Sequence, residues 1–533
     1  MSSRQTNGRI AVIVSVLLLS LVLRLRGLTA RSIWFDEASA WAAVTQFNAA
    51  ELLQSCKQNV HPPVWYFLLK SWVNVFGESL AALRGLSVLL GVATVAGAMG
   101  LAAESACSVT RTTIRFEAAV GAGLLMAISP LQILWSQQCR MYMLGAMLTL
   151  ISNWLLLIAH RRNQRRYWSA YSISAILLLH THNFGIFVAA AQAAYFGAAS
   201  VLSWWQLRSA STNASQPPAA ESTGLVSRPF RPTGRGLLFL FVIGLSYLPW
   251  MQVVRQQTAR VREDYWIRPF EFDQIAFLMR QLFLPVSGEQ LSSMLLEWTD
   301  WAIVIGIFDF LVFAIVLRIA ILPALVALVS FGGGIAVSAW LTPLMIPRYF
   351  LFGHAALLVA VAVTVIRIPR RCFRISVAAI LVLLSAATFL QLPSTQELSL
   401  RPGLSALIQR VLIRRQDDEP LLITSSFLFH AARYHVERTA VDQNVRVVLL
   451  RDNRNLRHYS GGPVIRSKDL LLPTALDSSD VESAWLIDTT GFSPWMERAD
   501  LSPAWTWDIG SQMNERETSG SQSTVTAVRI IRE

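Results

Sequence analysis

Long uninterrupted blocks of apolar residues constrain the fold of this chain more than any other feature of its sequence. An α-helix needs about 20 apolar residues to cross the roughly 30 Å hydrocarbon core of a bilayer. Several blocks of the 533-residue chain reach that length, and 53% of its residues are hydrophobic while only 15% are charged. A soluble domain of this size could not bury so much apolar surface. The sequence therefore predicts an all-α polytopic membrane protein.

The apolar blocks predict about eleven membrane spans. The first block is followed by Arg24-Leu25-Arg26 and not by a small-residue cleavage site, so we interpret it as a retained helix and not as a signal peptide. The predicted spans are residues 9–27, 83–103, 116–134, 142–160, 168–181, 184–203, 236–254, 299–317, 320–341, 351–366 and 375–392.

The basic residues lie in alternate gaps between these spans, which explains the net charge of +13 without a nucleic-acid partner. The basic gaps are residues 111–115, 161–166, 208–235, 318 and 367–374. By the positive-inside rule these gaps face the cytoplasm. We therefore expect a protein of the inner (cytoplasmic) cell membrane with its N-terminus inside, its C-terminal region outside, and its active site on the extracytoplasmic side.

Two domains are expected: a membrane module over residues 1–392 and a small outer α/β domain over residues 393–533. The second contains four strand-like runs with helix-like stretches such as residues 405–414 between them; the runs are residues 421–424, 446–450, 485–488 and 527–531. The first outer loop, residues 28–82, is rich in Trp and Tyr and predicts helices lying at the membrane interface. No disulfide framework or zinc site is indicated by the spacing of Cys56, Cys107, Cys139 and Cys372.

Polar side chains that a plain membrane anchor would not need gather in the predicted outer loops. The first outer loop carries the acidic pair Asp36 and Glu37, followed by His61. Later outer connections carry further candidates, namely Arg140, His182 and Arg348. All of them lie near span ends on the same predicted side, so we expect them to converge on one cavity at the membrane surface.

Transfer of a sugar from a polyprenyl phosphate suits such a set of side chains. The departing phosphate needs positive charge or a metal, and the attacking hydroxyl needs a carboxylate to take its proton. Asp36 or Glu37 would be that base, and Arg140 and Arg348 would bind the phosphate oxygens with bidentate geometry. Because a single carboxylate acts as a base and not as a nucleophile, the displacement inverts the configuration of the sugar carbon.

Five short motifs carry a resemblance to a known group of proteins. Trp34-Phe35-Asp36-Glu37-Ala38 resembles the W-x-D-E-A signature of bacterial GT-C membrane glycosyltransferases, a group similar to the protein O-mannosyltransferases and the lipid A aminoarabinose transferases. The later motifs follow in the same order: residues 61–66 resemble H-P-P-L-Y-Y, residues 129–142 resemble S-P…A-R-M-Y with Cys139 in place of Ala, residues 181–183 resemble T-H-Y, and Arg348-Tyr349 resembles the late R-Y pair. The match covers residues 20–350.

The resemblance implies a GT-C-like fold and a dolichyl- or undecaprenyl-phosphate sugar donor. It implies that Asp36 is the catalytic base, with Glu37 orienting Asp36 or the acceptor. It also adds Tyr142 and Tyr349 to the donor-binding candidates His61, Arg140, His182 and Arg348. Some relatives carry a second acid just after the Arg of the second outer loop to help hold a metal, and residues 140–144 contain no acid. No cofactor is therefore firmly predicted, and metal-free electrostatic catalysis is the expectation.

Two other functions remain open at this point. Asp309, in the middle of a predicted span, would suit a transporter or flippase of a lipid-linked substrate, although an interhelical hydrogen bond is the preferred interpretation of that residue. A receptor or assembly protein built around residues 393–533 is the third interpretation. The sequence leaves the sugar undetermined, and the acceptor can be a glycan, a lipid or a protein.

Overall fold

The computed structural model forms two compact units, each described by itself below. The helical unit comprises Met1–Leu25, His61–Trp65 and Gly85–Leu392, and the sheet unit comprises Arg26–Val60, Tyr66–Arg84 and Pro393–Glu533. The structure describes residues 3–106, 112–212, 234–263, 267–283, 293–390, 403–416, 418–440, 444–451, 461–489, 501–516 and 524–533. The predicted boundary between residues 392 and 393 stays a prediction, but most of the first outer loop packs with the C-terminal residues.

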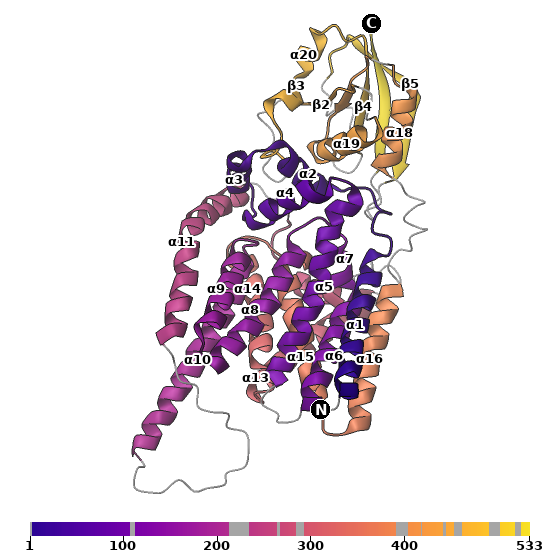
Figure 1. The fold of residues 1–533 in the computed structure, drawn as a ribbon. Helices are drawn as coiled ribbons and strands as arrows, with labels where there is room; N and C mark the ends of the chain where they lie inside the picture. The colour runs from indigo at the N-terminus through magenta and orange to yellow at the C-terminus, as the bar shows by residue number, and fades with distance from the viewer. Residues whose placement is uncertain are drawn as a thin grey trace. The chain divides into compact units, whose positions relative to one another are not determined.

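Helices that run alongside one another build the helical unit (Figure 1). They are α1 (Ser3–Leu25), α5 (Leu80–Ser105, which joins this unit from Gly85 on), α6 (Thr112–Ile128), α7 (Pro130–Ser136), α8 (Tyr142–Arg162), α9 (Arg165–Leu179), α10 (Gly185–Thr212), α11 (Gly234–Glu263), α12 (Asp273–Phe283), α13 (Ser293–Val316), α14 (Ile321–Trp340), the 3-10 helix η2 (Pro347–Phe350), α15 (Leu351–Ile366) and α16 (Arg371–Leu390). Each predicted span overlaps at least one of these helices.

The apolar helices confirm a multi-pass membrane protein. Among the described residues, 6 helices are long and apolar enough to cross a membrane, or 7 if the bent pair α6–α7 is one span. The predicted number of spans and their orientation stay predictions. Asp309 is exposed on α13, and the interhelical hydrogen bond preferred for it in the sequence analysis stays a prediction.

The predicted span 116–134 is not one straight helix, because the chain bends by 62° between α6 and α7. Pro130 begins α7 and has no backbone N–H to continue the helical hydrogen bonding. The freed carbonyl groups at the end of α6 accept hydrogen bonds from the buried Arg24 of α1, at 3.2 Å from Met126 O and 3.1 Å from Ala127 O. A cation at a helix C-terminus is favourable, so Arg24 stabilises the bend.

Close packing and polar contacts hold the helices that carry the later motifs. Gly145 of α8 faces α15 so closely that a Cβ atom there would lie 2.1 Å from Cζ of Phe352. Between α8, α9 and α10, the Gln192 side chain donates to Ser152 (2.9 Å) and accepts from the Tyr171 hydroxyl (3.1 Å). Such polar contacts inside a bundle satisfy groups that lipid cannot.

The sheet unit contains one six-stranded mixed sheet in the order β3-β2-β1-β4-β6-β5. Strands β3, β2, β1 and β4 are parallel, whereas β6 pairs antiparallel with β4 and β5. The elements of the unit are α2 (Phe35–Gln46), α3 (Ala49–Gln58), α4 (Val64–Phe76), α18 (Leu404–Arg414), β1 (Leu421–Ile423), α19 (Ser426–Thr439), β2 (Val447–Leu450), η5 (Ser467–Asp469), β3 (Leu470–Leu471), α20 (Pro473–Asp477), β4 (Ser483–Thr489), β5 (Trp505–Arg516) and β6 (Thr524–Arg532).

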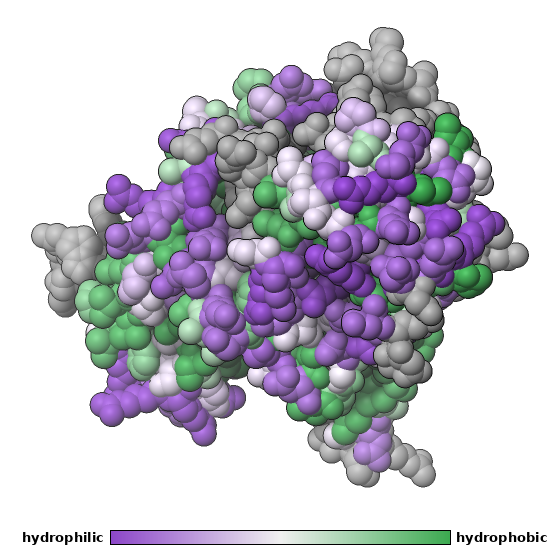
Figure 2. All heavy atoms as spheres, turned by 90° about the horizontal axis from the view of Figure 1, so that it is seen from above, coloured by the Kyte–Doolittle hydropathy of each residue, from purple (hydrophilic) through white to green (hydrophobic). Residues whose placement is uncertain are grey.

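The α/β architecture predicted for the C-terminal residues is confirmed. The four strand-like runs of the sequence are β1, β2, β4 and β6, and the helix-like stretch is α18. The core of the sheet contains Leu422, Leu450, Leu486, Val528 and Trp505, all buried. Strands β3 and β5 were not predicted, since β3 has only 2 residues and β5 is largely polar. Seen from above, hydrophilic residues are prominent on the surface, with hydrophobic residues among them (Figure 2).

Candidate active site

Glu37 of the acidic pair is buried against Arg84 within the sheet unit. The Arg84 guanidinium binds both oxygens of the Glu37 carboxylate, with Nε 2.9 Å from Oε1 and Nη2 2.7 Å from Oε2. Arg84 also donates to three carbonyl groups of the segment before α2, those of Leu28 (2.7 Å), Arg31 (3.0 Å) and Ser32 (3.1 Å). A buried charge needs such a partner, so the pair fixes the start of α2.

Asp36 differs from Glu37 because it is only partly buried. Both acids stand in the first turn of α2, where a carboxylate is favoured by the helix dipole. Glu37, Trp41 and Val44 recur at helical spacing and form the buried face of α2. Asp36 lies beside that face, so the two carboxylates have different surroundings: Glu37 is bound to Arg84, and Asp36 is the accessible one.

His61 and Arg140 meet in the helical unit. Nη2 of Arg140 donates to Nε2 of His61 at 3.0 Å, and both side chains are buried. Because a guanidinium can only donate hydrogen bonds, Nε2 of His61 must accept, and the ring proton is on Nδ1. Burial, followed by the charges of Arg140 and Arg348, holds the pKa of His61 well below its usual value. His61 is therefore a neutral ring that orients a cation.

His182 lies in the turn between α9 and α10 and is also neutral. Burial, then the charges of Arg140 and Arg348, lower the pKa of His182 to about 3. The backbone N–H of Phe184 donates to Nδ1 of His182 at 3.1 Å, so the proton of the neutral ring is on Nε2. That Nε2 atom is buried and has no hydrogen-bond partner among the described residues. The ring thus offers a donor to an incoming ligand.

Arg348, on the helix η2, is the second cation of the cluster, and two aromatic rings lie near its guanidinium. Its guanidinium lies 6.0 Å from the centre of the Trp135 ring and 5.8 Å from that of Tyr349. The rings of Tyr142 and Tyr349 lie 5.7 Å and 5.5 Å from His182. Trp135 was missed by sequence reasoning, although it stands inside the second outer-loop motif.

All six predicted donor-binding residues are thus brought together within the helical unit, from four separate segments of the chain. They are His61, Arg140, Tyr142, His182, Arg348 and Tyr349. Asp36 and Glu37 belong to the sheet unit. Two guanidinium groups beside neutral imidazoles form an electropositive site with several N–H donors, which suits the oxygens of a phosphate. Among the described residues, no group of three or more His, Cys, Asp and Glu side chains could hold a metal ion.

No family model and no curated protein sequence matches the chain, whereas solved structures do. ArnT from Cupriavidus metallidurans bound to undecaprenyl phosphate matches with a TM-score of 0.55 at 13% identity, covering 99% of this chain and 98% of that one. ArnT in the apo state gives 0.54 at 14% identity and 98% of both chains. The fold of this chain is therefore similar to that of ArnT. The fold expected from the sequence motifs is therefore confirmed.

A third similar structure is more distant. It is the archaeal oligosaccharyltransferase AglB from Archaeoglobus fulgidus in complex with an inhibitory peptide and a dolichol-phosphate. The TM-score is 0.48 at 13% identity, and the match covers 91% of this chain and 70% of that one.

Proposed function

We propose that this protein is a GT-C type glycosyltransferase, which transfers a sugar from a polyprenyl phosphate to an acceptor hydroxyl with inversion at the sugar carbon. The observation that carries this proposal is the cluster in which buried Arg140 binds His61, the His61 ring lies 5.6 Å from that of His182, and half-buried Arg348 lies against Tyr349, which neighbours His182. The shared fold with ArnT, one structure of which contains undecaprenyl phosphate, supports the same class of donor.

The cluster would act on the leaving group. As the bond between the sugar carbon and the phosphate oxygen breaks, its electron pair moves to the phosphate, whose negative charge increases. Preorganised donors aimed at that charge lower the barrier. Arg140 and Arg348 supply cationic donors, Nε2–H of His182 supplies a neutral one, and His61 holds the guanidinium of Arg140 in place.

The acidic pair would act on the acceptor. Asp36 takes the proton of the acceptor hydroxyl while the hydroxyl oxygen forms its bond to the sugar carbon from the side opposite the phosphate. The products are the glycosylated acceptor, polyprenyl phosphate and a protonated Asp36. Glu37 is bound to Arg84, so its role is to hold and orient the start of α2, which presents Asp36. The basic gaps between the spans support an active site at the extracytoplasmic face of the cell membrane.

Sugar transfer from a radiolabelled polyprenyl-phosphate sugar by purified protein in detergent tests this proposal. Detergent removes separate compartments, so a transporter or flippase would show no turnover, whereas an enzyme would. General-base removal typically costs about 10²–10⁴ in rate, and we expect a loss of that size in Asp36→Asn. The matched control is Asp273→Asn, since Asp273 is an exposed acid in the first turn of another helix, α12. Full activity of a stably folded Asp36→Asn protein would overturn the assignment of the base.

A further inference from the structure

The helix that carries the acidic pair packs against a helix near the other end of the sequence. Within the sheet unit, the ring centres of Phe35 on α2 and Phe427 on α19 are 4.8 Å apart. Farther along the same helices, the rings of Trp41 and Tyr434 meet edge to face at 5.1 Å. The docking is therefore specific along the length of α2.

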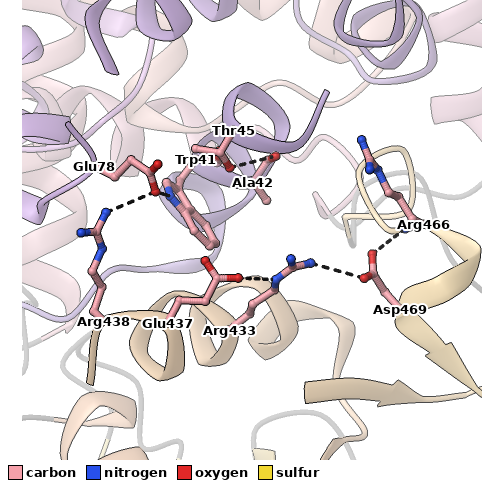
Figure 3. A network of polar contacts seen from close by, with 9 residues as sticks. All are labelled: Trp41, Ala42, Thr45, Glu78, Arg433, Glu437, Arg438, Arg466 and Asp469. Atoms are coloured by element: carbon pink, nitrogen blue, oxygen red, sulfur yellow. Dashed lines mark hydrogen bonds and ion pairs between the residues drawn. The ribbon is translucent and has the colours of Figure 1, made fainter. Parts of the chain in front are cut away.

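Glu78 links the two helices through polar contacts (Figure 3). One carboxylate oxygen of Glu78 accepts from Nε1 of Trp41 at 2.8 Å and from Nη2 of Arg438 at 3.2 Å. The hydroxyl group of Tyr434 donates to the backbone carbonyl of Glu78 at 3.1 Å. A buried indole N–H needs an acceptor, and Trp41 is 2% exposed, so Glu78 fixes the depth and rotation of its ring.

Both ends of α2 are also held by residues of the C-terminal region. Just before the helix, Oγ of Ser32 is hydrogen-bonded to Nε2 of His435 at 2.7 Å, across 403 positions of the sequence. At the other end, the Arg466 guanidinium donates to the carbonyl of Gln46, the last residue of α2, and lies 4.9 Å from the ring centre of Phe47. Contacts within the sheet unit thus hold α2 at both of its ends.

We propose that α19 and Glu78 form a positioning device for Asp36, so that the C-terminal residues are part of the catalytic apparatus through the helix they hold. This inference rests on the proposed role of Asp36 as the base. Trp41 stands one turn after Glu37 on the buried face of α2. Successive residues of an α-helix are about 100° apart around its axis, so a rotation of α2 redirects all of its side chains together. Releasing Trp41 would therefore change the direction in which the Asp36 carboxylate points.

The contacts have a kinetic signature that distinguishes positioning from general support of the fold. A misplacement of about 1 Å in a catalytic group can cost about 10²-fold in rate, while half-exposed ion pairs such as Arg438–Glu78 contribute little to stability. The donor-binding candidates belong to the helical unit. A defect in positioning should consequently lower kcat and leave the dissociation constant of the donor unchanged.

Two substitutions of Glu78 test the proposal. Glu78→Ala removes the acceptor of the Trp41 indole, and we expect kcat to fall about tenfold to a hundredfold, with faster amide hydrogen exchange in residues 35–46. Glu78→Gln keeps an amide oxygen that accepts from Trp41, and we expect kcat near that of the unchanged protein. The matched control is Glu515→Ala, which breaks the ion pair of Glu515 with Arg410 inside the same unit and away from α2. Its kcat should be unchanged.

Three outcomes would overturn the proposal. The first is an unchanged kcat in Glu78→Ala, and the second is an equal loss in Glu78→Gln and Glu78→Ala. The third is a parallel loss of kcat and donor affinity, which would indicate general misfolding. If Glu78→Ala does not fold, Tyr434→Phe, which removes only the hydroxyl group that donates to the Glu78 carbonyl, tests the same link between α19 and Glu78.

The Asp36→Asn experiment separates this proposal from the proposed function. Activity in Asp36→Asn would overturn the function assigned to the acidic pair. An inactive Asp36→Asn beside a normal Glu78→Ala would overturn only the positioning role of α19.

Discussion

At the scale of single residues, the protonation of two histidines decides what the cationic cluster can bind. His61 can only accept from Arg140, and His182 can only accept from the Phe184 backbone through Nδ1, so each ring has one determined tautomer. The motifs of the sequence predicted that these residues gather, because each motif lies at a span end on one predicted side. They could not predict the tautomers, since those depend on partners from other segments.

Loss of the Nε2–H donor of His182 should weaken donor binding. A hydrogen bond to a charged group contributes about 1.5–3 kcal/mol, so we expect His182→Phe to raise the dissociation constant of a polyprenyl phosphate about tenfold or more. His182→Gln keeps an N–H donor and should lose less. Titration of the purified protein with polyprenyl phosphate measures both. Equal affinity in His182→Phe and the unchanged protein would contradict the role of this ring.

The two acids should respond differently to neutral substitutions. Glu37→Gln leaves the buried Arg84 guanidinium without a counter-charge, which typically costs about 3–5 kcal/mol of stability. Asp36 is partly exposed and is not the partner of Arg84, so Asp36→Asn should lower the free energy of unfolding less than Glu37→Gln does, while it lowers the rate of transfer by about 10²-fold or more. Thermal unfolding of the two variants side by side measures the difference. Equal stability of Glu37→Gln and the unchanged protein would show that the ion pair does not hold α2.

At the scale of elements, the apolar and alternating patterns predicted most helices and the longer strands. The bend between α6 and α7 was not predicted, because apolar residues continue across Pro130 and only the missing backbone N–H breaks the helix there. The packing of α2 on α19 was also not predicted, since a contact such as Ser32–His435 spans 403 positions and leaves no local pattern. The contacts that α19 makes with α2, the helix of the acidic pair, could therefore not be derived from the sequence.

The contact between α8 and α15 should not tolerate a larger residue at position 145. A Cβ atom at Gly145 would lie 2.1 Å from the Phe352 ring, and that ring lies 5.5 Å from His182. Overpacking typically costs about 1–3 kcal/mol, so Gly145→Ala should lower thermal stability and weaken donor binding. Adding Phe352→Leu should restore part of both. The matched control is Gly244→Ala, where nothing lies within 4 Å of the added atom. A fully stable Gly145→Ala protein would contradict the packing.

At the scale of the whole molecule, the proposed chemistry divides between the two units. The cationic cluster and its aromatic surroundings belong to the helical unit, and the acidic pair belongs to the sheet unit with the C-terminal residues. The sequence predicted a separate C-terminal domain because its composition and strand-like runs differ from those of the membrane spans. Composition could not show that residues 26–60 and 66–84 join that unit, because this depends on packing between distant segments.

The sheet unit should lose stability in mild acid. Burial, followed by the charge of Arg433, lowers the pKa of His430 to about 3, and burial, followed by the charge of Arg84, lowers that of His435 to about 4. Unfolding returns each ring to the ordinary value of 6.5, so the unfolded chain binds more protons below that pH and stability falls as pH falls. At about one pH unit below 6.5, each of the two rings lowers the free energy of unfolding by about 1 kcal/mol.

Thermal unfolding at neutral pH and at about pH 5.5 measures this effect. The ring nitrogens of His430 have no hydrogen-bond partner among the described residues, so His430→Leu should fold and should reduce the dependence on pH. A transition temperature that rises on acidification would contradict the neutral state of both rings.

The division between a cationic donor site and an acidic base is tested most directly by measuring two constants on three proteins. The dissociation constant of polyprenyl phosphate and the kcat of sugar transfer are measured for the unchanged protein, Asp36→Asn and Arg140→Gln. We expect Asp36→Asn to bind the lipid normally and to lose kcat by about 10²-fold or more, whereas Arg140→Gln loses affinity by about tenfold or more. Normal kcat in Asp36→Asn, or normal affinity in Arg140→Gln, would contradict the account.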